Sequence, residues 1–180
     1  KAYVVRQNVV EPQDDRMLRL WEGTWGTVAT GVTESLQDAK GFSATKVFAV
    51  GTGGSAYYYN GDQHVLMPTP TKKTLRGVDG NAGNNVWAVG DKGTVIHYDG
   101  VSWKGVDYPS QADLRDVHVQ ADSTVWAVGN YTVQRRNTDG YWYSMKSPLG
   151  QWYAIDGTGP DDLWVVGRQG RVRHYDGNSW

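Results

Sequence analysis

The chain has 180 residues and a formal net charge of −1, with 23 glycines, nine tryptophans, eleven tyrosines and no cysteine. Nearly balanced charge gives no broad surface for nucleic acid or an anionic membrane, and no run of 18 apolar residues could insert into one. The absence of cysteine excludes disulfides, thiolate nucleophiles and cysteine-bound metals, whereas abundant glycine with large rings is typical of short strands and tight turns.

The predicted strands begin in residues 1–23, where Ala2 to Val5 and Met17 to Trp21 have strand character and enclose a polar segment with one proline. Four longer stretches follow, and each contains four runs of strand length separated by Pro, Ser, Gly, Asp and Asn. These stretches are residues 24–61, 62–100, 101–140 and 141–177.

The four stretches are copies of one repeat of about 39 residues. Each contains a segment of the type Val-Trp-Ala-Val-Gly, and the final glycines, Gly51, Gly90, Gly129 and Gly167, are 39, 39 and 38 residues apart. Turns like Tyr98-Asp99-Gly100 recur with similar spacing. The Asp-Gly pair predicts a tight turn, because the aspartate bonds its own backbone and glycine adopts the left-handed conformation.

Alternation along the Val-Trp-Ala-Val-Gly segment places Trp87 and Val89 on one side of a strand and Val86 and Ala88 on the other. Both sides are apolar, which predicts a strand buried between two neighbouring sheets. The glycine that ends the segment is expected to allow a positive φ or a bulge. The aromatic residue three positions after a turn, such as Trp103, is interpreted as the start of the next blade.

Units of four short strands repeated at this spacing predict an all-β fold, a β-propeller with four complete four-stranded blades and a partial one. A parallel β-helix has a shorter repeat, and no unit shows the apolar spacing of an amphipathic helix. The expected domain is 1–180, with a half blade at 1–23 and the start of a further blade at 178–180. The chain either closes its own ring, forms a segment of a larger propeller, or is completed by another copy.

The run VWAVGDKGTVIHYDGVSW, residues 86–103, resembles the bacterial propeller repeat of the photosystem II assembly-factor type and, more distantly, Kelch and Asp-box repeats. It departs from an Asp-box because Asp99 and Gly100 are adjacent. The resemblance implies a propeller fold and a role as a binding or assembly scaffold, although fold resemblance alone does not fix function.

No catalytic, metal or cofactor site is predicted. His97 and His174 occupy equivalent repeat positions, which indicates structural side chains, and no nucleophile elbow or metal-binding helix motif is present. The pairs Asp14-Asp15 and Asp161-Asp162 lie in loops and lack the spaced oxygen ligands of a calcium loop.

The candidate binding residues lie where the third complete unit departs from the repeat. Asn130 and Tyr131 shorten a turn, and Arg135-Arg136-Asn137 aligns with Ile96-His97-Tyr98. Aromatic rings with polar atoms offer further stacking faces for a partner. The selected ones are Tyr141, Trp142 and Trp152.

These features predict a non-enzymatic binding or assembly scaffold, secreted, periplasmic or at the cell surface. Its partner is expected to be another protein or further copies of the chain, with no nucleic-acid binding and no membrane insertion. One alternative is a lectin that binds a glycan at repeated sites between blades, which would gain avidity from several equivalent sites. The other is a lyase or hydrolase at the mouth of the central channel.

Overall fold

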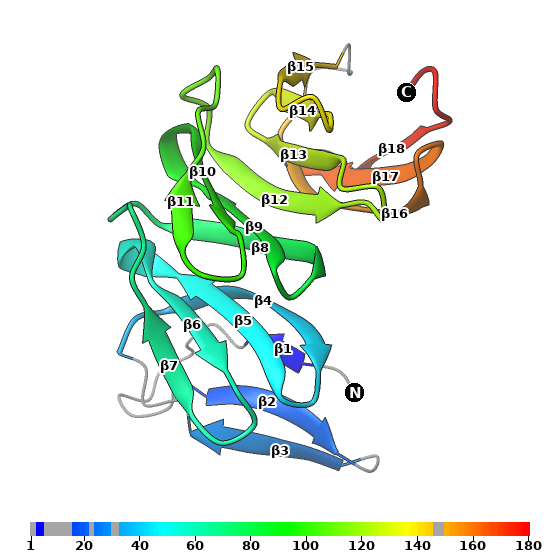
Figure 1. Cartoon of the computed structure of the whole chain (residues 1–180). Coiled ribbons are helices and arrows are strands. Elements are labelled where there is room, and N and C mark those ends of the chain that lie inside the picture. The colour runs from blue at the N-terminus through cyan, green and yellow to red at the C-terminus, as the bar shows by residue number, and fades with distance from the viewer. Residues whose placement is uncertain (1–2, 6–15, 22–23, 30–32, 146–149) are drawn as a thin grey trace.

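The computed structural model describes residues 3–5, 16–21, 24–29, 33–145 and 150–180, and for the first three ranges it describes the backbone alone. Its regular structure consists of short antiparallel strands and three 3₁₀ turns, and no α-helix occurs among the described residues. A helix long and apolar enough to cross a membrane is thus not found in this part of the chain. Figure 1 shows the strands gathered into successive sheets.

The sheets follow the order of the chain. The first has three strands, β1 (Tyr3–Val5), β2 (Arg16–Trp21) and β3 (Thr24–Ala29). Three four-stranded sheets follow, made of β4 (Leu36–Ser43), β5 (Lys46–Gly51), β6 (Ala56–Tyr59) and β7 (His64–Met67), then β8 (Leu75–Ala82), β9 (Asn85–Gly90), β10 (Thr94–Tyr98) and β11 (Trp103–Gly105), then β12 (Leu114–Val119), β13 (Val125–Gly129), β14 (Thr132–Arg136) and β15 (Trp142–Ser144). The last has three strands, β16 (Trp152–Gly159), β17 (Asp162–Gly167) and β18 (Arg171–Tyr175).

Strands β4, β8, β12 and β16 lie side by side, and each begins a sheet whose other strands extend outward from it. We call the surface formed by these four strands the inner wall. Sheets that radiate from such a wall are the blades of a propeller, so the predicted all-β propeller fold is confirmed. The described sheets do not close a ring, and β1–β3 and β16–β18 lie at opposite ends of the series (Figure 1).

The blades are offset by one strand from the sequence units, and the interpretation of Trp103 as the start of a blade is wrong. Trp103 lies opposite Tyr98 on β11, the outermost strand of the preceding sheet. The tight turn at Asp99-Gly100 returns the chain directly alongside β10, so hydrogen bonding continues within the same sheet. Trp180 packs on Trp126 and Tyr175.

The Tyr-Asp-Gly turns have the expected geometry. Asp99 Oδ1 accepts hydrogen bonds from the N–H groups of Val101 and Ser102 at 2.9 and 3.0 Å, and Gly100 has a φ of 98°. The Tyr98 hydroxyl donates to the Gly100 carbonyl at 2.9 Å. All three residues of the motif therefore stabilise the turn, and turn formation accounts for their recurrence.

The glycine that ends each Val-Trp-Ala-Val-Gly segment lies opposite a β-bulge, which was one of the two predicted reasons, but it does not have a positive φ. Gly90 is extended, with a φ of −170°, so a positive φ does not explain it. A Cβ on Gly90 would collide with the Thr74 carbonyl oxygen, and one on Gly129 would collide with that of Asp113. Glycine is needed here because the backbone that leads into the inner strand passes directly over this position.

Neighbouring blades pack against each other through apolar faces. We call the side of a blade that contacts the following blade its forward face and the other side its backward face. On the sheet β12–β15 the forward face presents Trp126, Val128 and Val133, which pack against Trp152 and Leu163 of the next sheet. The same relation holds between the earlier sheets. The core is therefore a series of apolar layers between blades rather than one central cluster.

The structural interpretation of the equivalent histidines is confirmed. His97 stacks on Trp87 with ring centroids 4.3 Å apart, and its Nε2 lies 2.8 Å from Asn85 Oδ1. His174 stacks on Trp164 at 4.4 Å in the corresponding place. Each histidine extends the tryptophan face of its own blade.

Candidate functional site on the inner wall

Every inner-wall strand has a β-bulge directly after its first residue. In β12 the irregularity lies between Leu114 and Asp116. Leu114 is fully buried in the layer shared with the preceding blade, while the bulge turns Asp116 toward the next inner strand. A bulge re-aims side chains in this manner, and here it places carboxylates along the joints between blades.

Asp116 links β12 to β16. Its Oδ1 accepts a hydrogen bond from the Val117 N–H, and its Oδ2 accepts one from the Ile155 N–H, both at 2.8 Å. Asp38 makes the equivalent link from β4 to β8, where its Oδ2 accepts from the Val78 N–H at 2.8 Å. Each carboxylate therefore satisfies a backbone donor of the following blade.

Burial raises the pKa of Asp116 to about 7, and the nearby Asp38 carboxylate acts in the same direction. The hydrogen bond from the Ile155 N–H opposes this rise. Burial also raises the pKa of Asp38. Desolvation outweighs the hydrogen bonds at both positions, because removing a carboxylate from water disfavours its charged form.

The Asp116 side chain predicts a dependence of stability on pH. A carboxyl group whose pKa is higher in the folded than in the unfolded chain stabilises the fold fully at a pH below its unfolded pKa. This stabilisation is lost as the pH rises through the folded pKa. For Asp116 that window runs from the ordinary aspartate pKa of 3.8 to about 7. Stability should therefore fall across this range, and the Asp116→Asn variant should show a shallower fall. Urea unfolding at several pH values measures both slopes, and equal slopes would contradict the assignment.

A row of basic and acidic side chains crosses the inner wall beside these links between blades. Lys40 Nζ lies 2.5 Å from Asp79 Oδ1. His118 Nδ1 lies 3.5 Å from Asp79 Oδ2 and 3.6 Å from Asp156 Oδ1. The row ends at Asp156, whose side chain is 93% exposed. Its members come from four successive blades and alternate between basic and acidic types.

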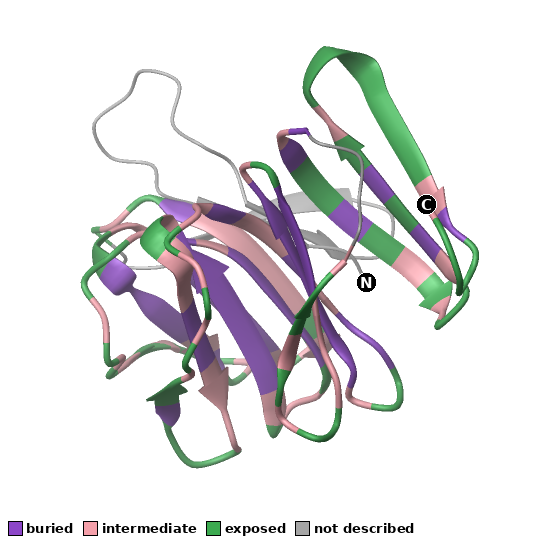
Figure 2. Ribbon diagram, turned by 90° about the horizontal axis from the view of Figure 1, so that it is seen from above, coloured by how far each residue is buried: buried purple, intermediate pink, exposed green. Residues whose placement is uncertain are grey.

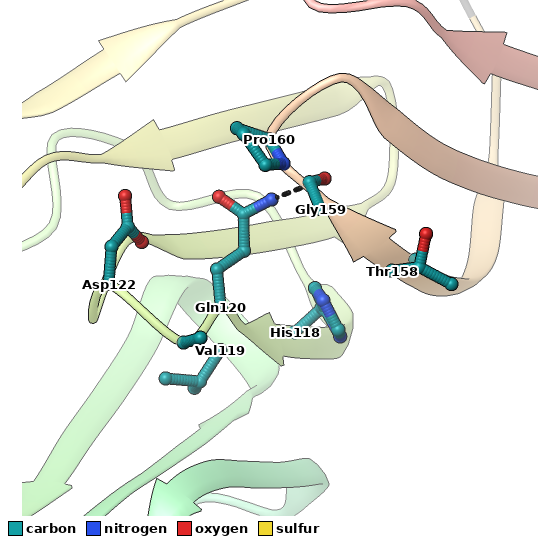
Figure 3. Close-up of a pocket in the computed structure, with 9 residues that line it drawn as sticks. His118, Val119, Gln120, Asp122, Thr158, Gly159 and Pro160 are labelled. Carbon is teal, nitrogen blue, oxygen red and sulfur yellow. Dashed lines mark hydrogen bonds between the residues drawn. The ribbon is translucent and has the colours of Figure 1, made fainter.

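A pocket of about 330 Å³ lies next to this row, between the turn that joins β12 to β13 and the turn that joins β16 to β17. Gln120 spans it, and its Nε2 donates to the Gly159 carbonyl at 2.8 Å (Figure 3). Gln120 Oε1 is buried and has no hydrogen-bond partner among the described residues. The pocket is lined by His118, Val119, Gln120, Ala121, Asp122, Gly157, Thr158, Gly159 and Pro160.

The sequence prediction missed this site, although it contained a signal. Lys40, Asp79, His118 and Asp156 are spaced by 39, 39 and 38 residues, as the repeat glycines are. Polar residues that recur with the repeat along equivalent strands indicate one continuous surface across the blades. The pocket itself is formed by two turns that only the fold brings together.

Asn130 and Tyr131 form the two-residue turn between β13 and β14, as the shortened repeat predicted. The Tyr131 N–H donates to the Gly150 carbonyl at 2.9 Å, and Asn130 Nδ2 donates to Asp113 Oδ2 at 3.3 Å. The Tyr131 ring is exposed and its backbone has a φ of 57°. This turn is anchored to its surroundings and lies apart from the residues that line the pocket.

The predicted alignment of Arg135 with Ile96 is wrong by one residue. Strand pairing places Arg135 opposite Trp126, as His97 lies opposite Trp87, because the preceding turn is one residue shorter. The Arg135 guanidinium carbon lies 5.6 Å from the Trp126 ring centroid. That of Arg136 lies 5.0 Å from the ring of Trp87 in the preceding blade. The two arginines therefore extend opposite faces of their sheet through cation–π contacts.

The three selected aromatic residues are separated as well. Tyr141 is exposed in a turn, where its N–H donates to Asp139 Oδ1 at 2.9 Å. Trp142 packs edge-on against Tyr108 with ring centroids 5.1 Å apart. Trp152 is fully buried between blades, so its ring offers no surface for stacking. The structure does not assemble the seven selected residues into one site.

Asp162 of the Asp161-Asp162 pair is part of the hydrogen bonding of its own blade. It accepts hydrogen bonds from Thr158 Oγ1 at 2.6 Å and Trp164 Nε1 at 3.0 Å, and His174 Nε2 lies 3.0 Å away. The pair Asp14-Asp15 lies outside the described residues. Within the described ranges, no three His, Asp or Glu side chains are placed to hold a metal ion.

Comparisons with solved structures identify the same architecture. YCF48 bound to a D1 peptide matches with a TM-score of 0.70 at 15% identity, over 92% of this chain and 59% of that one. The WD40 propeller domain of Doa1 matches with a TM-score of 0.76 at 14% identity, again over 92% and 59%. The chain is a β-propeller repeat protein.

A streptogramin B lyase structure also matches, with a TM-score of 0.70 at 11% identity over 89% of this chain and 61% of the lyase. The chain thus spans about three fifths of the length of each of these three proteins. No protein-family model and no curated protein matches the sequence. Identities this low establish the shared fold and nothing more about activity.

Proposed function

We propose that the chain is a non-enzymatic scaffold that binds a polypeptide partner at the inner wall. The observation that carries this proposal is the pocket between the β12–β13 and β16–β17 turns. It is large enough for one or two amino-acid side chains. Its lining offers backbone groups and the Gln120 side-chain amide, of which Nε2 is hydrogen-bonded and Oε1 is not. These groups can form hydrogen bonds with a peptide backbone. The lining includes no Phe, Tyr or Trp on which a sugar ring could stack, which favours a polypeptide over a glycan.

The titratable groups near the pocket already have structural partners. Asp116 holds the Ile155 N–H, and Asp79 Oδ2 accepts from the Val119 N–H at 2.7 Å. His118 lies between two carboxylates. A general base needs a lone pair that is free to reach substrate, whereas these side chains interact with groups of the neighbouring blade. This arrangement favours binding over the lyase or hydrolase alternative.

The comparison with YCF48 supports a polypeptide ligand, since that propeller has been solved with a D1 peptide bound. The charge of the site indicates which side chains the partner should carry. Asp122 lines the pocket, and the exposed Asp156 ends the charged row beside it. An acidic rim attracts a lysine- or arginine-bearing segment and repels an acidic one.

The proposal is tested with two fluorescent peptides of equal length, one rich in lysine and one with glutamate in its place. We expect the lysine peptide to bind at least about tenfold more tightly at low salt, and the difference to shrink as salt is added. Fluorescence anisotropy against protein concentration measures both affinities. Equal affinity for the two peptides would contradict the acidic-rim proposal.

A pocket-filling variant and a matched control locate the binding. Ala121 is exposed and lines the pocket, so Ala121→Trp should abolish binding of the lysine peptide without disturbing the core. Val101 is exposed in a turn of a different blade, so Val101→Trp should bind like the parent chain. Unchanged binding by Ala121→Trp would place the peptide elsewhere and overturn the proposed site.

A further inference from the structure

Two neighbouring blades carry an arginine at the same position of the repeat. Arg76 follows the buried Leu75 on β8, and Arg115 follows the buried Leu114 on β12. Each arginine lies in the β-bulge of its inner strand. Both are half-buried, in contrast to the fully buried middle strands β9 and β13 of their sheets (Figure 2). The two side chains therefore start from equivalent backbone positions and can be compared directly.

Arg76 has a carboxylate partner in its own blade. Its Nε donates to Asp91 Oδ1 at 2.5 Å, and its Nη2 donates to Asp91 Oδ2 at 3.2 Å. Two parallel hydrogen bonds of this kind are the geometry in which a guanidinium group recognises a carboxylate. Asp91 begins the turn after β9, and its N–H donates to the Thr74 carbonyl at 3.0 Å.

Arg115 lacks the corresponding partner. Asn130 occupies the position of Asp91, because its N–H donates to the Asp113 carbonyl at 2.9 Å as that of Asp91 does to Thr74. Asparagine carries no charge, and no carboxylate of the described residues forms an ion pair with Arg115. Arg115 Nε and Asn130 Oδ1 are both buried without a hydrogen-bond partner in the described part of the chain. A buried donor left unpaired is costly, so a group from outside the chain that pairs with it would bind favourably.

The surroundings indicate which anion suits Arg115. Asp91 shows that a carboxylate fits the equivalent arginine. Asp113 Oδ2 accepts a hydrogen bond from Asn130 Nδ2 at 3.3 Å, so one negative charge already lies beside the position of the missing partner. This charge repels a phosphate dianion more strongly than a singly charged carboxylate. We propose that Arg115 binds the carboxylate of a ligand, as Arg76 binds that of Asp91.

The proposed carboxylate site does not depend on the pocket between the β12–β13 and β16–β17 turns. Arg115 lies near the beginning of β12, whereas the pocket lies at the end of this strand and in the turn after it. Binding at either place can therefore be lost while binding at the other remains.

Nuclear magnetic resonance of the Nε–H groups of the isotope-labelled chain tests the proposal with acetate as the probe. At constant ionic strength, the Arg115 signal should shift and saturate at millimolar acetate. The Arg76 signal should stay in place, because Asp91 already occupies its guanidinium group. Phosphate should shift the Arg115 signal less than acetate. Equal responses of Arg115 and Arg76 to acetate, or a phosphate effect as large as that of acetate, would overturn the proposal.

Two variants test the role of the guanidinium group. Arg115→Lys keeps the charge but lacks the planar pair of donors, so the acetate-induced shift of the Asn130 amide signal should be mostly lost. Asp91→Ala removes the partner of Arg76, so the Arg76 signal should now respond to acetate as that of Arg115 does. A full response in Arg115→Lys, or an Arg76 signal that still ignores acetate in Asp91→Ala, would contradict the proposal.

A blocked glutamate residue, compared with acetate, distinguishes the two sources of a carboxylate. Tighter binding of the blocked residue would assign the site to an acidic side chain of a polypeptide, and equal binding would assign it to a free acid. Failure of both probes to shift the Arg115 signal would overturn the carboxylate site, and it would leave the test of peptide binding at the pocket unaffected.

Discussion

Replacing Trp126 with alanine should lower the free energy of unfolding by about 3–5 kcal/mol. The indole is fully buried in the layer between the sheets β12–β15 and β16–β18, where it contacts Trp180 and Tyr175 edge-on or tilted. Its removal leaves a cavity that two rigid sheets cannot easily close. Chemical denaturation followed by tryptophan fluorescence and circular dichroism measures the loss.

Trp164 provides the matched control, because it occupies the same repeat position on the sheet β16–β18. Half of its surface is already in contact with solvent, so Trp164→Ala should cost only about 1 kcal/mol, mainly from the lost stacking with His174. If both variants lost the same stability, the assignment of forward faces would be wrong.

Replacing Gly129 with alanine should destabilise the fold by about 1–3 kcal/mol. An added Cβ would run into the Asp113 carbonyl oxygen and lie 2.8 Å from the Leu114 Cα, so the inner strand would have to move. That movement would disturb the hydrogen bond from the Asn130 N–H to the Asp113 carbonyl, which is 2.9 Å long. Thermal unfolding monitored by circular dichroism measures the effect.

Gly105→Ala is the control for this effect. A Cβ at Gly105 meets no atom within 4 Å, so the variant should be neutral or slightly more stable because alanine restricts the unfolded chain. If Gly129→Ala were as stable as Gly105→Ala, the close approach of the inner strand would not be a constraint on the fold.

The repeat made the fold predictable, because residues that recur at equivalent positions need equivalent surroundings. The spacing of Gly51, Gly90, Gly129 and Gly167 was enough to predict four similar units of short strands. The assignment of Trp103 failed for a physical reason, since a hairpin's outer strand and the first strand of a new blade have the same alternation. Only the hydrogen bonds of β11 to β10 distinguish the two possibilities.

The site was less predictable, because it depends on contacts between units. Asp116 and the Ile155 N–H are 39 residues apart in sequence, and nothing local to either residue marks the bond. The prediction favoured departures from the repeat, such as Arg135, and these proved to be substitutes for packing roles held elsewhere by histidine. The exposure of Trp164 was also hidden, because its sequence surroundings match those of Trp126.

The central claim is that a polypeptide partner binds the pocket on the inner wall, and nuclear magnetic resonance of the isotope-labelled chain tests it most directly. Titration with the lysine-rich peptide should move the backbone amide signals of Gln120, Ala121, Thr158 and Gly159, which line the pocket. Signals of the distant turn at Val101 should stay in place. Shifts confined to other residues, or no shifts at saturating peptide, would contradict the claim.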